Sequence, residues 1–335
     1  MLVSQSETSA EALWYIGSGH AEIRREQLRV PGPGDVCVRA LYSAISRGTE
    51  RLVSAGRVPE SEYERMRAPF MSGTFPFPVK YGYAVVGRVE RGPSELLDRI
   101  VFALHPHQSV FILPAQAVVP IPDGVPAARA VLAANMETAL NAVWDAAPAP
   151  GDSIAVVGAG VVGSLVAWLC GGIPGVRVTL VDIEPMRAKL AHALGALFAF
   201  PDAAPHDCDL VVHASGTASG LASALTLAGE EATVLELSWH GASAVPVALG
   251  GAFHSRRLKL VSSQVGRVAP SHRLRWTPRR RLVAALDLLR DSRLDALAAP
   301  AVEFRELPAL LPDILSGESG VLCQIVTYPA GEATD

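Results

Sequence analysis

The spacing of hydrophobic positions changes near residue 150, and the change predicts two kinds of structure. Residues 12–120 hold short runs rich in β-branched and aromatic side chains, separated by Gly and Pro, which is typical of strands joined by turns. These runs are 12–16, 22–28, 36–43, 84–91, 99–103 and 109–113. Residues 43–78 form a long connection with one expected helix at 60–67. From residue 151 onward, apolar runs alternate with helical patterns, which predicts an α/β region with a doubly wound parallel sheet.

The most informative stretch begins this second region. Residues 154–157 are apolar without interruption and predict a buried parallel strand, which leads into Gly158-x-Gly160-x-x-Gly163 and then a helix. Gly158 permits a tight turn, Gly160 lets backbone N–H groups approach a pyrophosphate, and Gly163 lets the helix pack against the strand. The start of that helix offers free N–H groups and the positive end of its dipole to phosphates. The backbone there belongs to Val161 and Val162.

The next strand, residues 176–181, ends at Asp182, which lies 24 positions after Gly158. An acidic residue about 20 positions after the first glycine typically binds the ribose hydroxyls of the dinucleotide. A carboxylate there would repel a 2′-phosphate, so we expect NAD(H) rather than NADP(H). The alternative is that Asp182 only caps the helix that follows. Arg187 would favour NADP(H) if it faced the ribose, but we place it on the outer face of that helix.

Several polar or aromatic residues follow predicted strand ends, where ligands bind in open α/β sheets. Ser215 follows one such strand, and Trp239 and His240 follow the next one along the chain. We therefore expect Ser215 and Trp239 to contact the cofactor, with Trp239 and His240 near its nicotinamide. Thr138 begins a helix that faces the same region. His213 lies inside a buried-strand pattern and is expected to be a hydrogen-bonded core histidine.

Composition narrows the class of protein. The chain has 335 residues, enough for two domains, and half of them are hydrophobic. A net charge of −4 gives no case for binding nucleic acid or an anionic membrane surface. The first residues lack a signal-peptide core, and no apolar run reaches the ~18 residues of a membrane span. Four scattered cysteines without a CxxC motif are typical of a reduced, cytoplasmic protein. We expect a small-molecule partner.

The whole pattern resembles the medium-chain dehydrogenase/reductase superfamily. The phrases that carry the resemblance are residues 36–40, 81–87, 98–102, 137–139 and 150–152. The resemblance implies a GroES-like catalytic domain of residues 1–138 and 288–335, with its active site in a cleft against a Rossmann domain of residues 139–287. It implies hydride transfer to or from a nicotinamide. It also implies a homodimer formed through the strand at 259–265.

Within that superfamily, the catalytic zinc ligands are missing here. Zinc-dependent members use a Cys, the His of a Gly-His-Glu motif and a second Cys. The corresponding places hold Ser46, Tyr83 and either Ala134 or Asn135, and the four-Cys structural lobe is absent too. Hydroxyl, phenol and amide groups bind Zn²⁺ poorly compared with thiolate and imidazole. We therefore predict a zinc-independent protein with no metal.

Two groups of zinc-lacking proteins share further phrases with this chain. The Ser-Arg-Gly-Thr-Glu phrase at 46–50 is similar to the bacteriochlorophyllide-type 1-hydroxyethyl dehydrogenase subgroup. Phrases at 134–138, 238–241, 253–257 and 263–266 resemble a branch of proteins named "zinc-binding alcohol dehydrogenase". The subgroup suggests a porphyrin-like substrate, and a smaller ketone suits the residues equally well.

Without zinc, another group must stabilise the alkoxide formed by hydride transfer and supply its proton. Tyr83 stands at the place of the zinc-binding His and is our candidate donor; the alternative is that it only fills the space. Lys80 would lower the pKa of Tyr83 if their side chains converged. Thr49 and Glu50 resemble the hydroxyl–carboxylate pair of a proton relay, displaced by one residue. Ser46 is expected to contact the substrate.

Two further clusters have several interpretations. His105-Pro106-His107 lacks a third metal ligand at readable spacing, so we favour a surface turn, with a general acid as the alternative. An arginine cluster could be a solvated loop, a site for a substrate carboxylate or phosphate, or a partner for acids on another subunit. Its members are Arg267, Arg273, Arg275, Arg279, Arg280 and Arg281. The net negative charge argues against nucleic acid.

The hypothesis that joins these observations is an NAD(H)-dependent oxidoreductase that interconverts a secondary alcohol and a ketone. One rival is a reductase of activated C=C bonds or quinones, which would reduce enones and not oxidise simple alcohols. The other rival is a protein that binds NAD(H) without turnover.

Overall fold

The computed structural model describes residues 9–317 and 320–329. The chain divides into two compact units, which we call unit 1 (Met1–Ala134 with Ala298–Asp335) and unit 2 (Asn135–Leu297). The sequence analysis placed these boundaries at residues 138 and 288. The α/β fold with a β-rich region and a parallel sheet is confirmed.

The strands of unit 1 form two sheets. One has the order β2-β1-β5-β4, and the other has the order β16-β17-β3-β6-β7-β9, with β8 also paired to β3. The strands are β1 Ser9–Gly17, β2 His20–Gln27, β3 Asp35–Ile45, β4 Ser72–Gly73, β5 Val79–Lys80, β6 Val85–Arg91, β7 Ile100–Ala103, β8 Val110–Pro114, β9 Val118–Pro120, β16 Ala298–Glu303 and β17 Cys323–Thr327. Because β17 pairs antiparallel with β3, the tail returns to the first region as predicted.

Helices of unit 1 lie in its connections. They are α1 Arg47–Ser54, α2 Ala127–Ala130 and α8 Leu307–Ser316, while α3 Ala133–Ala146 leads into unit 2. The helix expected at residues 60–67 is wrong, because only a 3₁₀ turn at Glu60–Glu62 forms there. Helix α1 occupies the part of residues 43–78 expected to be irregular. It has only eight residues and contains Gly48, so its length and helix propensity did not mark it.

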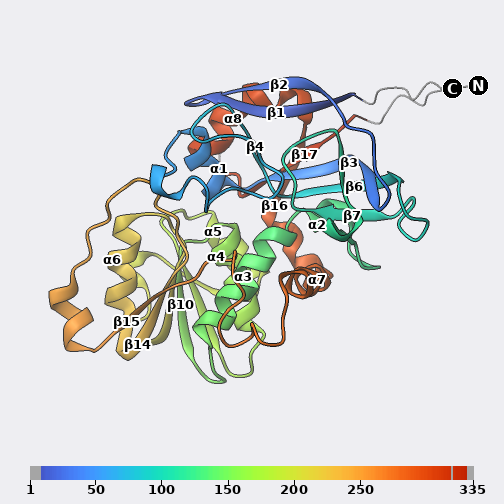
Figure 1. Cartoon of the computed structure of the whole chain (residues 1–335). Helices are drawn as coiled ribbons and strands as arrows, with labels where there is room; N and C mark the ends of the chain where they lie inside the picture. Colours follow the sequence, from blue (N-terminus) through green and yellow to red (C-terminus); the bar gives the residue numbers. More distant parts are fainter. Residues whose placement is uncertain (1–8, 318–319, 330–335) are drawn as a thin grey trace, which may run out of the picture. The chain divides into compact units, whose positions relative to one another are not determined.

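Unit 2 has one parallel sheet of order β12-β11-β10-β13-β14-β15. Its strands are β10 Ser153–Val157, β11 Arg177–Val181, β12 Leu197–Ala199, β13 Cys208–His213, β14 Ala228–Glu236 and β15 Lys259–Ser262. In order of appearance this is 3-2-1-4-5-6, the doubly wound order whose direction reverses beside its first strand. Ligands bind at that reversal, so the loop after β10 lies at the expected binding edge (Figure 1).

Helices connect the parallel strands and bury them. They are α4 Val161–Gly171, α5 Arg187–Ala193 and α6 Ala218–Leu227, followed by α7 Pro278–Leu288 later in the unit (Figure 1). Ile154, Ala155 and Val156 of β10 are completely buried, which explains why that strand is apolar throughout. By contrast, all four residues of β15 at the sheet edge are exposed. No helix of the described residues is long and apolar enough to cross a membrane.

Candidate active site

The glycine turn after β10 has the geometry that its sequence predicted. Gly158 has a φ of +107°, and a Cβ there would lie 2.6 Å from the backbone nitrogen of Ser215. A Cβ on Gly163 would lie 2.0 Å from the carbonyl oxygen of Gly158, so helix α4 can approach the turn only with glycine. Gly160 differs, because a Cβ there would meet nothing within 4 Å. Two glycines are therefore required by the fold, and the third leaves open space beside the turn.

The start of α4 has donors for an anion. Gly160 is its N-cap residue, and no side chain caps it. The first N–H groups of a helix have no partner within the helix, and here they belong to Val161, Val162 and Gly163. Together with the positive end of the helix dipole and the open space at Gly160, they form a site suited to phosphate oxygens. These residues fit the pyrophosphate of a dinucleotide.

Asp182 follows β11 and reaches back to this turn. Its Oδ2 accepts the N–H of Ala159 at 2.7 Å, and its Oδ1 accepts the N–H of Glu184 at 3.0 Å. The alternative that Asp182 caps the following helix is wrong, because α5 has Met186 as its N-cap residue and no side-chain cap hydrogen bond. An ionised carboxylate has about four lone-pair sites, and the two backbone bonds use half of them. The remaining sites can accept ribose hydroxyls.

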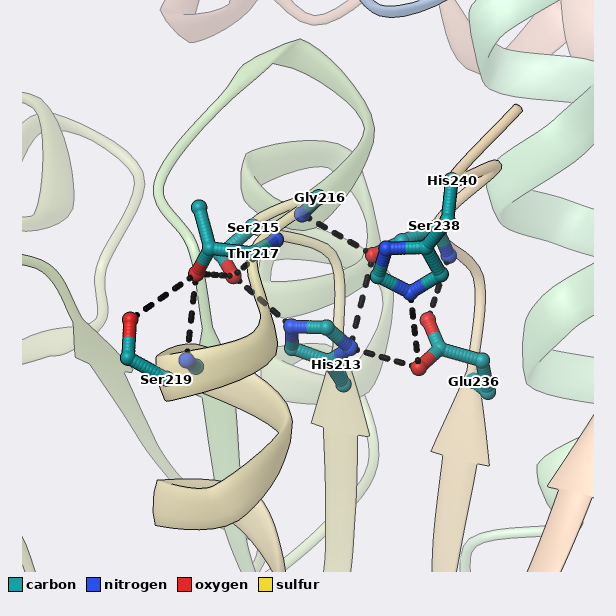
Figure 2. A network of polar contacts seen from close by, with 9 residues as sticks. His213, Ser215, Gly216, Thr217, Ser219, Glu236, Ser238 and His240 are labelled. Carbon is teal, nitrogen blue, oxygen red and sulfur yellow. Dashed lines mark hydrogen bonds and ion pairs between the residues drawn. The ribbon is translucent and has the colours of Figure 1, made fainter. Parts of the chain in front are cut away.

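A polar network joins the ends of β13 and β14 (Figure 2). His213 is fully buried, with its Nδ1 2.7 Å from Glu236 Oε2 and its Nε2 2.7 Å from Ser215 Oγ. The prediction of a hydrogen-bonded core histidine is confirmed. The Ser238 N–H donates to Glu236 Oε1 at 2.6 Å, and the Gly216 N–H donates to Ser238 Oγ at 3.0 Å.

The remaining cofactor candidates lie on unit 2 as follows. Ser215 is in the loop between β13 and α6, Trp239 is in the loop after β14, and Thr138 is in α3. Thr138 and Trp239 are both half-buried. Their contact with a cofactor stays a prediction.

In unit 1, three hydroxyl groups meet where we expected the reaction. The Tyr83 hydroxyl lies 2.5 Å from Ser46 Oγ and 3.0 Å from Thr49 Oγ1. The phenol has a single proton, which it can donate to either of these two oxygens. Burial raises the pKa of Tyr83 to about 12, although its hydrogen bonds with Ser46 and Thr49 act in the opposite direction. At neutral pH the phenol keeps its proton, so it can protonate an alkoxide but is a poor base for an alcohol.

Glu50 is the neighbour of Thr49 on α1 and is fully buried. Its Oε2 accepts the hydroxyl of Tyr15 at 2.7 Å and lies 3.1 Å from His107 Nε2, and its Oε1 accepts the N–H of Ser46 at 2.7 Å. Burial alone would raise the pKa of Glu50. The charge of His107 and these hydrogen bonds outweigh burial and bring the pKa below its ordinary value, so the buried group is a carboxylate.

The network continues beyond Glu50 through residues that the sequence analysis did not select. The Nδ1 of His107 lies 2.8 Å from Ser43 Oγ, and that oxygen lies 2.9 Å from the hydroxyl of Tyr328. A Cβ on Gly82, whose φ is +121°, would lie 2.7 Å from the His107 ring. In the sequence, Gly82 was the local signal that another group, here the ring of His107, approaches the backbone before Tyr83.

Lys80 has a different role from the one expected. Its Nζ donates to Glu26 Oε2 at 2.6 Å and to Gln108 Oε1 at 2.9 Å. The predicted convergence with Tyr83 is wrong, because the ammonium group is held by this acid and this amide. Burial raises the pKa of Tyr83, contrary to the lowering expected from Lys80.

The His105–His107 segment is buried rather than a surface turn, so the favoured interpretation of it is wrong. The ring of His105 stacks on Phe111, with centroids 4.1 Å apart, and its Nδ1 bonds the carbonyl oxygen of Pro106 at 2.9 Å. Burial lowers the pKa of His105 to about 3, so the ring is neutral and serves packing. His107 instead completes the Glu50 network.

The arginine cluster is not a uniform surface. Arg281 is buried and forms an ion pair with Glu137 at 3.0 Å, and it also bonds Asn141. Burial raises the pKa of Glu137, and the charge of Arg281 opposes that shift. Arg280 lies over the ring of Trp276, 4.0 Å from its centroid. The expectation of a solvated or ligand-binding group therefore fails for Arg281, which binds other parts of unit 2.

The superfamily's catalytic zinc does not fit these residues. Ser46 and Tyr83 stand at two of its ligand positions and are hydrogen bonded to each other as neutral hydroxyls. A phenol with a pKa of about 12 is a poor Zn²⁺ ligand at neutral pH. Among the described residues, the group of three His, Cys, Asp or Glu side chains close enough to hold a metal is on unit 2: His213, Glu236 and His240.

Comparison with known proteins identifies the fold. No family model and no curated protein matches the sequence significantly. A proposed zinc-binding dehydrogenase from Sinorhizobium meliloti, bound to NADP, is 18% identical with a TM-score of 0.76, covering 96% of this chain and 100% of that one. An alcohol dehydrogenase from Escherichia coli in complex with NADH is 16% identical with a TM-score of 0.75, covering 96% and 99%.

A third solved structure has the same fold. L-idonate 5-dehydrogenase from Escherichia coli is 13% identical with a TM-score of 0.78, covering 96% of this chain and 99% of that one. At these identities the likeness concerns the fold. The fold predicted from the resemblance to medium-chain dehydrogenases and reductases is thereby confirmed.

Proposed function

We propose that this chain is a zinc-independent, NAD(H)-dependent oxidoreductase of the medium-chain dehydrogenase/reductase superfamily that interconverts a secondary alcohol and a ketone. The observation that carries the proposal is the glycine turn, where the helix start is uncapped and the space beside Gly160 is open. Solved structures with this fold hold NADP or NADH, which supports a nicotinamide cofactor.

Asp182 supports NAD(H) as the preferred cofactor. Its carboxylate is fixed beside the glycine turn by the N–H of Ala159, at 2.7 Å. A fixed negative charge at the end of the second strand accepts two ribose hydroxyls and repels a 2′-phosphate. Ile183, directly after it, is 74% exposed and offers an apolar surface that suits an adenine ring.

The chemistry follows from the hydroxyl cluster of unit 1. When bound, the reduced cofactor supplies a hydride to the carbonyl carbon. Tyr83 donates a hydrogen bond to the carbonyl oxygen and then its proton to the alkoxide that forms. Ser46 and Thr49, 2.5 and 3.0 Å from the phenol, orient the hydroxyl, and a proton from water then restores the phenol. Because the pKa of Tyr83 is raised, the phenol is protonated at neutral pH, which is the form that donates to the alkoxide.

We also propose a homodimer through β15. This strand forms an edge of the parallel sheet, and its Leu260 and Val261 are 39% and 37% exposed. An exposed apolar edge strand is a template for pairing with another strand. Sedimentation at several protein concentrations would test it, with a charged substitution at Val261 expected to yield monomers.

The cofactor assignment is tested by fluorescence titration with NADH and, in parallel, NADPH. The wild-type protein should bind NADH more tightly. Asp182→Asn keeps an acceptor for the Ala159 N–H but removes the charge, so NADH affinity should fall roughly tenfold and NADPH affinity should not fall. Asp202→Asn, at an exposed acid of the same unit, is the matched control and should change neither. A wild-type preference for NADPH would overturn the assignment.

The reaction is tested by a screen of ketones and enones with the preferred cofactor. Tyr83→Phe should lower kcat for ketone reduction by about 100-fold or more with an unchanged Kd for NADH, because it removes only the proton donor. Tyr81→Phe, at the neighbouring buried tyrosine, is the control. Turnover of enones alone would favour the double-bond reductase, and binding without any turnover would favour the non-catalytic protein.

A further inference from the structure

Three potential metal ligands converge at the ends of β13 and β14, in the network of Figure 2. One ligand atom from each of His213, Glu236 and His240 lies within 4.8 Å of the others. The carboxylate lies between the two imidazoles. Its Oε2 is 2.7 Å from Nδ1 of His213 and 3.6 Å from Nε2 of His240. The sequence analysis did not group these three residues. His213 and Glu236 are 23 positions apart, and Glu236 and His240 are 4 positions apart.

One of these atoms lacks a partner. The Nε2 of His240 is buried and makes no hydrogen bond in the part of the chain that the structure describes. Its separation of 3.6 Å from Glu236 Oε2 is too long for a hydrogen bond. A buried polar atom without a partner is destabilising, so its presence points to a missing ligand.

In His213 and Glu236, the atom that faces away from the proposed ligand atom already has a hydrogen-bond partner. Ser215 Oγ lies 2.7 Å from Nε2 of His213, and the Ser238 N–H donates to Oε1 of Glu236 at 2.6 Å. These bonds leave Nδ1 of His213 and Oε2 of Glu236 directed at each other and toward His240. Metal-binding imidazoles and carboxylates are typically oriented by such outer contacts, which fix the tautomer and the ring.

We propose that His213, Glu236 and His240 form a binding site for a divalent transition-metal ion, with Zn²⁺ as its preferred occupant. Two imidazole nitrogens and one carboxylate oxygen are a donor set that Zn²⁺ favours. At Zn²⁺ bond lengths, tetrahedral ligand atoms lie about 3.4 Å apart. The separations of 2.7 and 3.6 Å lie on either side of that value, so small side-chain rotations suffice.

Three protein ligands leave a fourth position of a tetrahedral ion open to water or another oxygen ligand. The site is on unit 2, at the carboxyl edge of the parallel sheet. It shares no residue with Ser46 and Tyr83 of unit 1, which take two of the superfamily's zinc positions. It is therefore a different site, and it does not depend on the proposed reaction.

The test begins with protein dialysed against a chelator and then freed of the chelator. Calorimetric titration with Zn²⁺ should show one ion per chain. Titration with Co²⁺ should produce visible absorption bands of a low-coordinate site with nitrogen and oxygen ligands. Absence of binding in the wild-type protein would overturn the proposal.

Two conservative variants locate the ion. His240→Gln and Glu236→Gln should each weaken Zn²⁺ binding by at least ~100-fold, the upper range for loss of an outer contact. The control is His206→Gln, at an exposed imidazole of unit 2, which should bind Zn²⁺ like the wild type. Circular dichroism and Tm would show that the variants fold. Unchanged binding in both ligand variants, or an equal loss in the control, would contradict the site.

Ser215→Ala distinguishes the proposed site from Zn²⁺ bound elsewhere on the surface. It leaves all three ligands in place and removes only the oxygen beside Nε2 of His213. Zn²⁺ affinity should fall by roughly 10-fold, with the stoichiometry unchanged. No change in affinity would show that the ion does not bind through Nδ1 of His213.

Discussion

The two regions that support the proposed reaction are built from different materials. The glycine turn of unit 2 consists of backbone: Gly158 and Gly163 allow the chain to approach itself, and its donors are main-chain N–H groups. The Glu50 network of unit 1 consists mainly of side chains. They are the Glu50 carboxylate, the His107 imidazole and the hydroxyl groups of Tyr15, Ser43 and Tyr328, joined by the backbone N–H of Ser46.

The difference teaches which change each region tolerates. A turn made of backbone is sensitive to added atoms, because a single Cβ can fill the space that it needs. A buried polar network is sensitive to removed atoms, because each missing partner leaves another group unsatisfied in a medium of low polarity. Substitutions that add or remove atoms should therefore separate the two regions cleanly.

The largest effect is expected from removing the acid of the network. Glu50→Ala leaves the His107 ring, the Tyr15 hydroxyl and the Ser46 N–H without their acceptor. Breaking a buried, hydrogen-bonded ion pair costs about 3–5 kcal/mol of unfolding free energy. Urea denaturation followed by circular dichroism measures it.

The control for that variant is Glu62→Ala, which removes an ion pair 3.0 Å long with the exposed Arg65 in the same unit. It should cost less than about 1 kcal/mol, as exposed ion pairs usually do. Equal losses in the two variants would show that Glu50 is not held as the structure has it.

The next effect comes from adding one methyl group to the glycine turn. In Gly163→Ala the new Cβ would lie 2.0 Å from the Gly158 carbonyl oxygen. Overpacking against backbone costs about 1–3 kcal/mol, although alanine is the better helix former by about 1 kcal/mol. We expect a lower Tm and weaker NADH binding together.

Gly160→Ala sharpens this result, because its Cβ would meet no atom of the protein within 4 Å. Stability should fall by no more than about 1 kcal/mol, because alanine is a poorer N-cap residue than glycine. NADH affinity should fall roughly tenfold as the methyl group occupies the space for the pyrophosphate. Gly160→Ala binding NADH as well as the wild type would place the cofactor elsewhere.

The smallest effect concerns pH. The folded pKa of Glu50 lies below its ordinary value of 4.5, so the folded state binds fewer protons at this carboxyl than the unfolded state does. Its stabilisation is complete above about pH 4.5 and is lost as the pH falls through the folded pKa. Urea midpoints should therefore decline less steeply for Glu50→Gln than for the wild type below pH 4.5. Identical slopes in the two proteins would mean that Glu50 is not ionised when folded.

The sequence predicted most of the fold and the backbone part of the site. The apolar run of β10, the glycine spacing and Asp182 lie within 30 positions, so their arrangement follows from local rules. The assignment of residues 288–335 to the first domain was predicted, and the structure adds that β17 pairs with β3. In these parts the geometry of the backbone is determined either by residues close together in the chain or by the domain arrangement of the superfamily that the chain resembles.

The side-chain part could not be predicted in the same way. His107 meets Ser43 across 64 positions, and Ser43 meets Tyr328 across 285. No spacing rule links such residues, and a histidine beside a proline suggests a surface turn as readily as a buried loop. Lys80 misled for a similar reason, because its true partner Glu26 lies 54 positions away on another strand.

The return of the tail has a consequence for how the protein is made. Strand β17 pairs with β3, and Tyr328 completes the hydrogen-bond chain at Ser43. A ribosome that has finished β3 must still add all of unit 2 before it reaches β17, which takes on the order of tens of seconds. Unit 2 is therefore fully synthesised while the larger sheet of unit 1 still lacks β16 and β17. The nascent chain can complete its second unit before its first, and during that interval the open side of β3 is exposed to chaperones and to neighbouring chains.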